Sequence, residues 1–326
     1  MEEELLKIIN FNENHIEQAL KIARKNYENE RKCIGILPEI EEYPDFTPFV
    51  KNGLGVSAFI SEKMVGYLCC YDTFENAFGT MNAIGVWSPL HGNGIIDCDY
   101  KYVFDKMYEE AAKKWVDLKA TSHAITFYAH NNLIQNQLYR YGFGLRCIDS
   151  IREINEIEFN YNLKYNILEL EHNEFKLIYP IGILLCHHLW ESPMFQHHTE
   201  IREEEKDGDP DEFAKWQINE KFRYFVAKDD GKIIAYMKIH DEGENFIGDV
   251  KNMKHIHGAY YFPEYRGKGI MENILNFIIK KLRDENNQLM GVDFESFNPT
   301  AHNFWLKYFT EYTHSVVRRI DDLYIK

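Results

Sequence analysis

A glycine-rich turn at residues 265–270, with the sequence Tyr-Arg-Gly-Lys-Gly-Ile, joins an apolar strand-like segment at 258–262 to an apolar helical run at 271–282. The first backbone N–H groups of a helix have no partner within the helix, and the helix dipole adds about half a positive charge at that end. Glycines at positions 267 and 269 allow the backbone to come close to a ligand. The turn therefore predicts an anion site that holds a phosphate or pyrophosphate through main-chain N–H groups.

Three known phosphate-binding sequence patterns contain a glycine-rich turn of this kind. A P-loop requires Ser or Thr after Gly-Lys, whereas Lys268 is followed by Gly269. A dinucleotide fingerprint requires a third glycine where Glu272 stands, and no parallel alternating unit surrounds the turn. The remaining pattern is Arg-x-x-Gly-x-Gly/Ala, and on this pattern the turn resembles the coenzyme A loop of the GCN5-related N-acetyltransferases (GNAT). Met271 departs from the pattern at its last position.

A second element of the same resemblance lies downstream. Residues 291–295 read as a strand, and the segment 298–305 starts with Asn298 and Pro299, which are typical of a helix start. The segment is similar to the family's Asn-x-x-Ala-x-x-Leu/Phe-Tyr element, in which the asparagine and the helix contact the cofactor and the tyrosine often protonates the departing thiolate. Trp305 takes the tyrosine position, and an indole N–H cannot supply a proton near neutral pH. Tyr308 could serve instead, unless both aromatic residues are only the apolar face of the last helix.

The first half of the chain has the same order of elements. A strand at 83–87, a turn at 88–95 and a helix at 100–115 are followed by a strand at 124–129 and a helix that ends in Gly-Phe-Gly at 142–144. His91 stands where the family has Arg or Gln, and either Leu138 or Tyr139 occupies the tyrosine position. The chain is therefore identified as a tandem GNAT protein with domains at 1–158 and 159–326. The first domain is interpreted as degenerate, shaping the acceptor cleft or stiffening the pair.

The fold class implied by the resemblance is α/β (α+β). Each GNAT-like domain is expected to hold a mixed, mainly antiparallel sheet flanked by helices, with a splay between two central parallel strands where the cofactor enters. A length of 326 residues and 45% hydrophobic content suit two domains. Asp230-Gly231, between apolar runs at 222–227 and 233–239, predicts a hairpin in the second domain.

The resemblance implies acetyl-CoA as the cofactor, with coenzyme A as the product. Arg266 is expected to donate charge-assisted hydrogen bonds to the pyrophosphate, and main-chain N–H groups at 267–271 complete the cradle. The main chain near Tyr260 and Tyr261 is expected to pair with the pantetheine arm and to stabilise the oxyanion. The candidate cofactor-binding residues are Tyr260, Tyr261, Arg266, Gly267, Lys268, Gly269, Ile270, Met271, Asn298, Asn303 and Trp305.

The reaction implied is direct transfer of an acetyl group to a primary amine of a small molecule or peptide, with the chemistry in the second domain. An alkyl amine is protonated at pH 7, and removing its proton costs roughly 4 to 5 kcal/mol. Glu295 is the first candidate for the general base and Tyr308 for the acid, with Asp249 and His257 as further candidates for the base. The plainer interpretation of Glu295 is a solvent-facing carboxylate. The alternative function is an acyl-CoA-binding module or sensor without turnover.

Charge and composition limit the kinds of binding partner and the cellular compartment that the sequence predicts. The net charge of −15 argues against a nucleic-acid partner and suits a cationic amine, and the acidic segment 199–212 could attract one. None of the six cysteines has Cys-x-x-Cys spacing, and no signal peptide is recognised at the start of the sequence. Both observations predict reduced thiols in a cytoplasmic protein. The apolar run at 178–189 is too short to span a membrane. No metal site is expected from the histidines at 187–188, 197–198, 255 and 257, and the oligomeric state is not readable.

Overall fold

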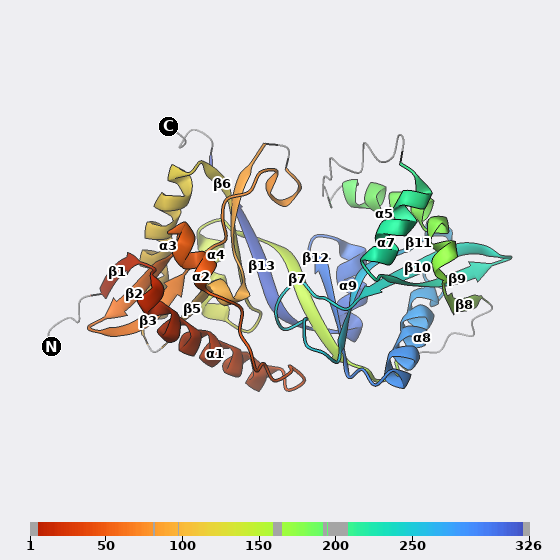
Figure 1. Cartoon of the computed structure of the whole chain (residues 1–326), viewed down its shortest axis with the longest axis horizontal. Coiled ribbons are helices and arrows are strands. Elements are labelled where there is room, and N and C mark those ends of the chain that lie inside the picture. Colours follow the sequence, from red (N-terminus) through yellow and green to blue (C-terminus); the bar gives the residue numbers. More distant parts are fainter. Residues whose placement is uncertain are drawn as a thin grey trace. The chain divides into compact units, whose positions relative to one another are not determined.

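The computed structural model describes residues 6–80, 82–96, 98–158, 165–191, 194 and 208–321, which form two compact units (Figure 1). Unit 1 comprises residues 1–149 and 311–326, and unit 2 comprises residues 150–310. The expected boundary near residue 158 therefore differs from this division, because the last strand of the sequence returns to unit 1. This strand, β13 (Thr310–Arg319), pairs antiparallel with β6 (Ala120–Tyr128), from Thr313 opposite Tyr128 to Arg319 opposite Ser122.

Unit 1 contains an antiparallel sheet and a parallel strand pair. The antiparallel sheet has the order β1 (Leu6–Asn10), β2 (Val56–Ile60), β3 (Lys63–Leu68) and β5 (Asn93–Ile95). The parallel pair joins β4 (Ile84–Ser88) to β6. The α-helices in the described part of unit 1 are α1 (Ile16–Cys33), α2 (Thr47–Asn52), α3 (Tyr100–Asp117) and α4 (Asn132–Arg140). Strand β7 (Gly144–Glu153) follows α4, and its last four residues belong to unit 2.

Helices α1 and α3 pack on different side chains of β3. Met64 and Tyr67 belong to the cluster that α1 forms with the sheet, whereas Val65 and Leu68 belong to the cluster built around α3. Trp115 of α3 is fully buried, and its indole N–H donates to the carbonyl oxygen of Leu54 at 3.2 Å. Each helix therefore buries one apolar face against the same sheet.

Unit 2 is built on five strands with the order β8 (Asn166–Glu169), β9 (Arg223–Asp229), β10 (Lys232–His240), β11 (Met253–Tyr261) and β12 (Leu289–Glu295). All of these neighbours are antiparallel except β11 and β12, which are parallel. The predicted hairpin is confirmed at the β9–β10 turn, where Asp230 and Gly231 both have positive φ. The α-helices formed by the described residues of unit 2 are α5 (Tyr179–Trp190), α7 (Pro210–Asn219), α8 (Ile270–Asp284) and α9 (Pro299–Tyr308).

The two faces of this sheet are covered by different helices. Tyr224, Val226 and Tyr236 lie in the cluster with α5 and α7, whereas Phe225 contacts Phe277 of α8. This alternation follows the period-two rule of a strand, since successive side chains point to opposite faces. Among the described residues no helix is both long and apolar enough to cross a membrane; α5, over the apolar run, has 12 residues.

The parallel strands β11 and β12 separate before they end. They pair from Met253 opposite Leu289 to Ile256 opposite Val292, and β11 then continues to Tyr261 and β12 to Glu295. At the same point the β10–β11 register shifts between Lys238 and Ile239, which leaves His257 as an extra residue on β11. The splay expected between two central parallel strands is therefore present in unit 2.

A buried histidine packs against three glycines next to this splay. His255 is fully buried, and burial lowers the pKa of its ring to about 3, so the ring is neutral at pH 7. A Cβ atom on Gly291 would lie 2.2 Å from His255 Nε2, and one on Gly243 or Gly248 would lie 2.5 or 2.6 Å from the same atom. The absence of side chains at these positions is what admits the imidazole.

We expect Gly291→Ala to lower the free energy of unfolding by about 3 kcal/mol, because the new methyl group would overlap the histidine ring inside a packed core. Gly258→Ala is the matched control, since it lies on the neighbouring strand and its Cβ would meet nothing closer than 3.7 Å. Chemical denaturation monitored by tryptophan fluorescence measures both. Equal stability of the two variants would contradict this account of the His255 packing.

Candidate active site

The glycine-rich turn ends at the first residue of α8. Gly269 is the N-cap residue with φ +73°, and Gly267 has φ +70°, a backbone conformation that favours glycine. Asn273 donates to the carbonyl oxygen of Gly269 through its side-chain amide at 2.7 Å, which braces the turn against the helix. The sequence Gly-Lys-Gly thus bends the chain from β11 into α8 and leaves the free N–H groups of the first helical turn directed away from the helix.

A pocket in unit 2 lies between β11, α5, the start of α8 and α9. Six predicted cofactor-binding residues line it together. They are Tyr260, Tyr261, Arg266, Met271, Asn298 and Trp305. Arg266 is exposed, and its guanidinium carbon lies 5.7 Å from the ring centroid of Tyr261. The structure thus brings residues of two distant sequence motifs to one pocket next to the α8 N-terminus.

The start of α9 forms another wall of this pocket. Asn298 is the N-cap residue, and its Oδ1 accepts hydrogen bonds from the backbone N–H groups of Thr300 and Ala301, both at 3.2 Å. Trp305 is buried on the same helix and lines the pocket. Asn303 is exposed and is not among the lining residues. Lys268 is also exposed, with its Nζ 5.0 Å from the ring centroid of Tyr265.

The two predicted catalytic residues lie outside the lining of the pocket. Tyr308, one helical turn beyond Trp305, donates from its hydroxyl to Glu272 Oε1 at 3.4 Å, and burial raises the pKa of its phenol. Glu295 is partly buried at the end of β12, where β12 has already separated from β11. Their catalytic roles stay predictions, with Glu295 at the splay and Tyr308 against α8.

The two further candidates for the base are held by main-chain contacts. Asp249 accepts a hydrogen bond from the N–H of Gly243 at 3.2 Å, and burial raises the pKa of its carboxyl. His257, at the bulge, lies with Nε2 2.8 Å from the carbonyl oxygen of Glu242, and burial lowers the pKa of its ring.

Sequence reasoning missed a lysine beside the splay. Burial lowers the pKa of Lys238 to about 8, although the carboxylate of Asp293 opposes this shift. Its Nζ lies 4.1 Å from the ring centroid of Phe222, and its backbone pairs with Gly258 of β11. A lysine in a strand reads as solvent-exposed, so no sequence signal marks it. The pocket residues Leu185 and His188 of α5 were also missed, because the apolar run at 178–189 does not indicate which of its side chains face a pocket.

The corresponding segment of unit 1 differs from the predicted strand–turn–helix. After β4 the chain forms a 3-10 turn, η3 (Leu90–Gly92), and then β5, which pairs with β3. Helix α3 has Asp99 as its N-cap residue, with the carboxylate accepting from the N–H of Tyr102 at 3.3 Å. His91 is buried among aromatic rings, and burial lowers the pKa of its ring to about 4. Unit 1 therefore has a carboxylate and a neutral histidine where unit 2 has glycine and Arg266.

The chain is similar to known proteins in sequence pattern and in fold. Residues 182–309 match the model of the acetyltransferase (GNAT) family, whose members are acyltransferases. No curated protein matches the sequence. The structure is similar to a GCN5-related N-acetyltransferase from Sphaerobacter thermophilus, with 9% identity, 98% of each chain covered and a TM-score of 0.55. A tandem GNAT protein from the clavulanic acid biosynthesis pathway matches with 10% identity, coverage of 97% of this chain and 98% of that chain, and a TM-score of 0.47.

The predicted fold class is confirmed by these observations. Both units combine helices with mainly antiparallel strands and one parallel pair, and the likeness to the Sphaerobacter thermophilus structure extends over nearly the whole chain.

Proposed function

We propose that the chain is an acetyl-CoA-dependent N-acetyltransferase whose chemistry takes place in unit 2. The observation that carries the proposal is the pocket in which Arg266 and Met271, at the start of α8, meet Asn298 and Trp305 of the second motif. A helix that starts at a glycine with positive φ presents free N–H groups and a partial positive charge to an anion. A pyrophosphate-bearing ligand fits that donor set.

Arg266 and the first turn of α8 would hold the pyrophosphate, and the main chain from Ala259 to Tyr261 would pair with the pantetheine arm. Both lie on the wall of the same pocket. Acetyl-CoA, when bound, supplies an activated thioester. Glu295 is placed at the separated end of β12, where it can take the proton that an amine must lose before attack. Tyr308 follows Trp305 by one helical turn on α9, is protonated at neutral pH like any phenol, and would supply a proton to the leaving thiolate.

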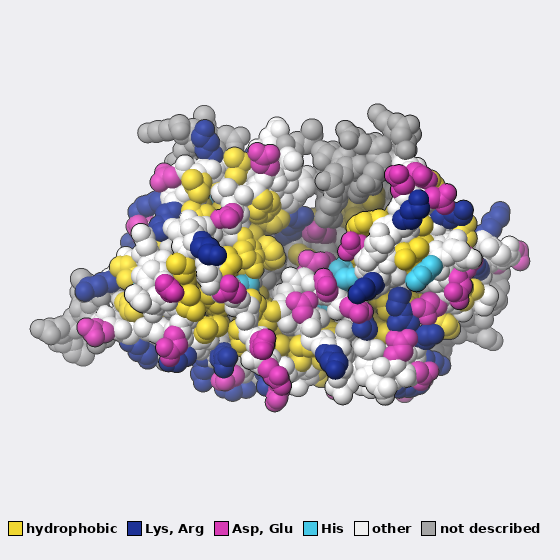
Figure 2. Space-filling view, in the orientation of Figure 1, with side chains coloured by type: hydrophobic (Ala, Val, Ile, Leu, Met, Phe, Trp, Pro, Cys, Tyr) yellow, Lys and Arg dark blue, Asp and Glu magenta, His cyan; other side chains and the backbone are white. Residues whose placement is uncertain are grey.

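We further propose that the acceptor is a primary amine of a small molecule or peptide and that it is cationic. The net charge of −15 favours a cation by long-range attraction. On the face drawn in Figure 2, acidic and basic side chains of the described residues are intermixed over the surface. That pattern differs from the clustered Lys and Arg residues that nucleic-acid backbones require. Most of the acidic segment 199–212 lies outside the described residues.

Mixing the purified chain with acetyl-CoA and a panel of polyamines, amino sugars and basic peptides tests the proposal. We expect release of coenzyme A thiol, detected with a thiol-reactive dye, that depends on both acetyl-CoA and one class of amine. The expected binding stoichiometry is one coenzyme A per chain, since Asp99 places a carboxylate at the start of α3 in unit 1. Binding without thiol release for every amine would favour the alternative, an acyl-CoA sensor, for which the buried Trp305 in the tyrosine position is the supporting observation.

A further inference from the structure

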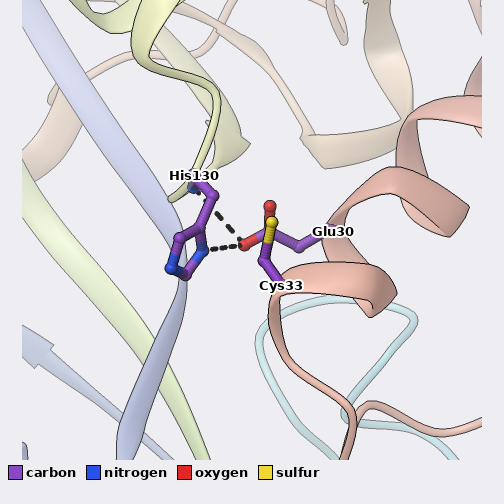
Figure 3. A group of neighbouring side chains, drawn as sticks. All are labelled: Glu30, Cys33 and His130. Carbon is purple, nitrogen blue, oxygen red and sulfur yellow. Dashed lines mark hydrogen bonds and ion pairs between the residues drawn. The ribbon is translucent and has the colours of Figure 1, made fainter.

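Unit 1 brings three potential metal ligands together far from the glycine-rich turn in the sequence. Glu30 and Cys33 lie on the last turn of α1, and His130 follows β6 just before α4 (Figure 3). One ligand atom from each side chain lies within 4.8 Å of the other two. The pair on the helix is spaced i, i+3, which places both side chains on the same face.

Glu30 is the buried member of this group. Its side chain is only 3% exposed, and its Oε1 lies 2.8 Å from His130 Nδ1 and accepts from the backbone N–H of His130 at 3.4 Å. Burial raises the pKa of the Glu30 carboxyl, although His130 opposes the shift. A carboxylate this deeply buried is costly unless a cation compensates it, and His130, with 43% of its side chain exposed, is charged only when protonated.

The three donor atoms form a set that zinc prefers. A carboxylate oxygen, a thiolate sulfur and an imidazole nitrogen are all common Zn²⁺ ligands, with bonds of about 2.0 to 2.3 Å. Tetrahedral geometry then places the ligand atoms roughly 3.3 to 3.7 Å from one another. The Glu30–His130 contact, now 2.8 Å, would open by about 0.5 to 0.9 Å, and the Cys33 thiol would approach by at most about 1.5 Å. Cys33 is exposed, so its side chain is free to turn.

The group also forms part of a pocket wall. Glu30, Cys33 and His130 all line a pocket of about 490 Å³ in unit 1, together with residues of α1, α3 and the α4 N-terminus. An ion bound to three protein ligands has a fourth tetrahedral position, and here that position would face the pocket. Three protein ligands plus one open position is the pattern of zinc sites that bind water or substrate.

We propose that Glu30, Cys33 and His130 bind Zn²⁺ in unit 1, with the fourth position open to the pocket for a water molecule or for an oxygen, nitrogen or sulfur atom of a small ligand. A carboxylate and a thiolate together balance the charge of the ion, which removes the cost of the buried charge on Glu30. The site is independent of acyl transfer in unit 2, and it gives unit 1 a ligand of its own.

Titration with Co²⁺ tests this site, because cobalt occupies zinc sites and a cysteine thiolate bound to it gives a charge-transfer absorption band. The full chain, stripped with a chelator and dialysed, is titrated with Co²⁺ and then with Zn²⁺. We expect a thiolate band that saturates at one equivalent and disappears when Zn²⁺ displaces the cobalt. Cys33→Ser should abolish the band, and Glu30→Gln or His130→Gln should weaken Co²⁺ binding at least about tenfold.

Two control variants keep the test specific. Cys147→Ser removes a different, partly exposed thiol of unit 1, and Glu28→Gln removes an exposed carboxylate from the same helix as Glu30. Both should leave the band and the affinity unchanged, and thermal melts confirm that each variant is folded. The proposal is overturned if the wild-type chain gives no thiolate band, or if a band survives in Cys33→Ser.

Discussion

Gly269→Asp is expected to weaken coenzyme A binding by at least about 100-fold, or about 2.7 kcal/mol. The substitution places a carboxylate on the N-cap residue of α8, where the pyrophosphate is proposed to accept hydrogen bonds from the first helical turn. The new side chain can bond to those N–H groups itself, and its charge repels the phosphates. Aspartate tolerates positive φ better than most residues, so the helix should still form. Isothermal titration of the full chain with coenzyme A measures the effect.

Gly231→Asp provides the matched control for this experiment. Gly231 also has positive φ, at +81°, it lies in unit 2, and a Cβ added to it would meet nothing within 4 Å. The control therefore introduces the same charge and the same backbone conformation, but in the β9–β10 turn. If both variants bind coenzyme A equally well, the phosphates do not lie at the start of α8. If both lose binding equally, a general effect of charge or folding is responsible.

Replacement of Glu295 by Gln is expected to lower the turnover number by about 100-fold or more while leaving the affinity for coenzyme A nearly unchanged. A general base that removes the amine proton contributes about 10² to 10⁴ to the rate. Glutamine keeps the size and shape of the side chain at the end of β12 but cannot accept the proton. Turnover at saturating amine, followed by thiol release, is the appropriate measurement, together with a titration of coenzyme A.

Glu264→Gln is the control for the change in net charge. Glu264 is exposed in the short 3-10 turn η5 (Pro263–Tyr265), two residues before Arg266, so this variant removes a carboxylate near the pocket but away from the splay. We expect its turnover to stay within about threefold of the wild-type value, as is usual for an exposed charge. Wild-type turnover in Glu295→Gln would remove Glu295 from the mechanism and direct attention to His257 and Lys238, which lie beside the same splay.

Much of unit 2 could be predicted from local sequence. The Asp230-Gly231 turn, the glycines at 267 and 269 and the Asn298 cap depend on backbone conformations that only a few residue types favour. Each motif also stands directly between a strand and a strand or helix in the sequence, so a short window contains the information. The same local reasoning was wrong for residues 93–95, because pairing with β3 outweighed the expected turn.

What the amino-acid sequence alone determined is thus the family resemblance, the fold class and the glycine-rich turn before α8, all of which follow from short-range conformational preferences and periodicity. Only the tertiary structure decided that β13 completes unit 1, that burial keeps His91 neutral and lowers the pKa of Lys238, and that Glu30 meets His130. These features depend on which distant segments cover a side chain or pair with a strand. Hydrophobic patterning specifies that a face is buried but not against which partner, and a pKa depends on the partner.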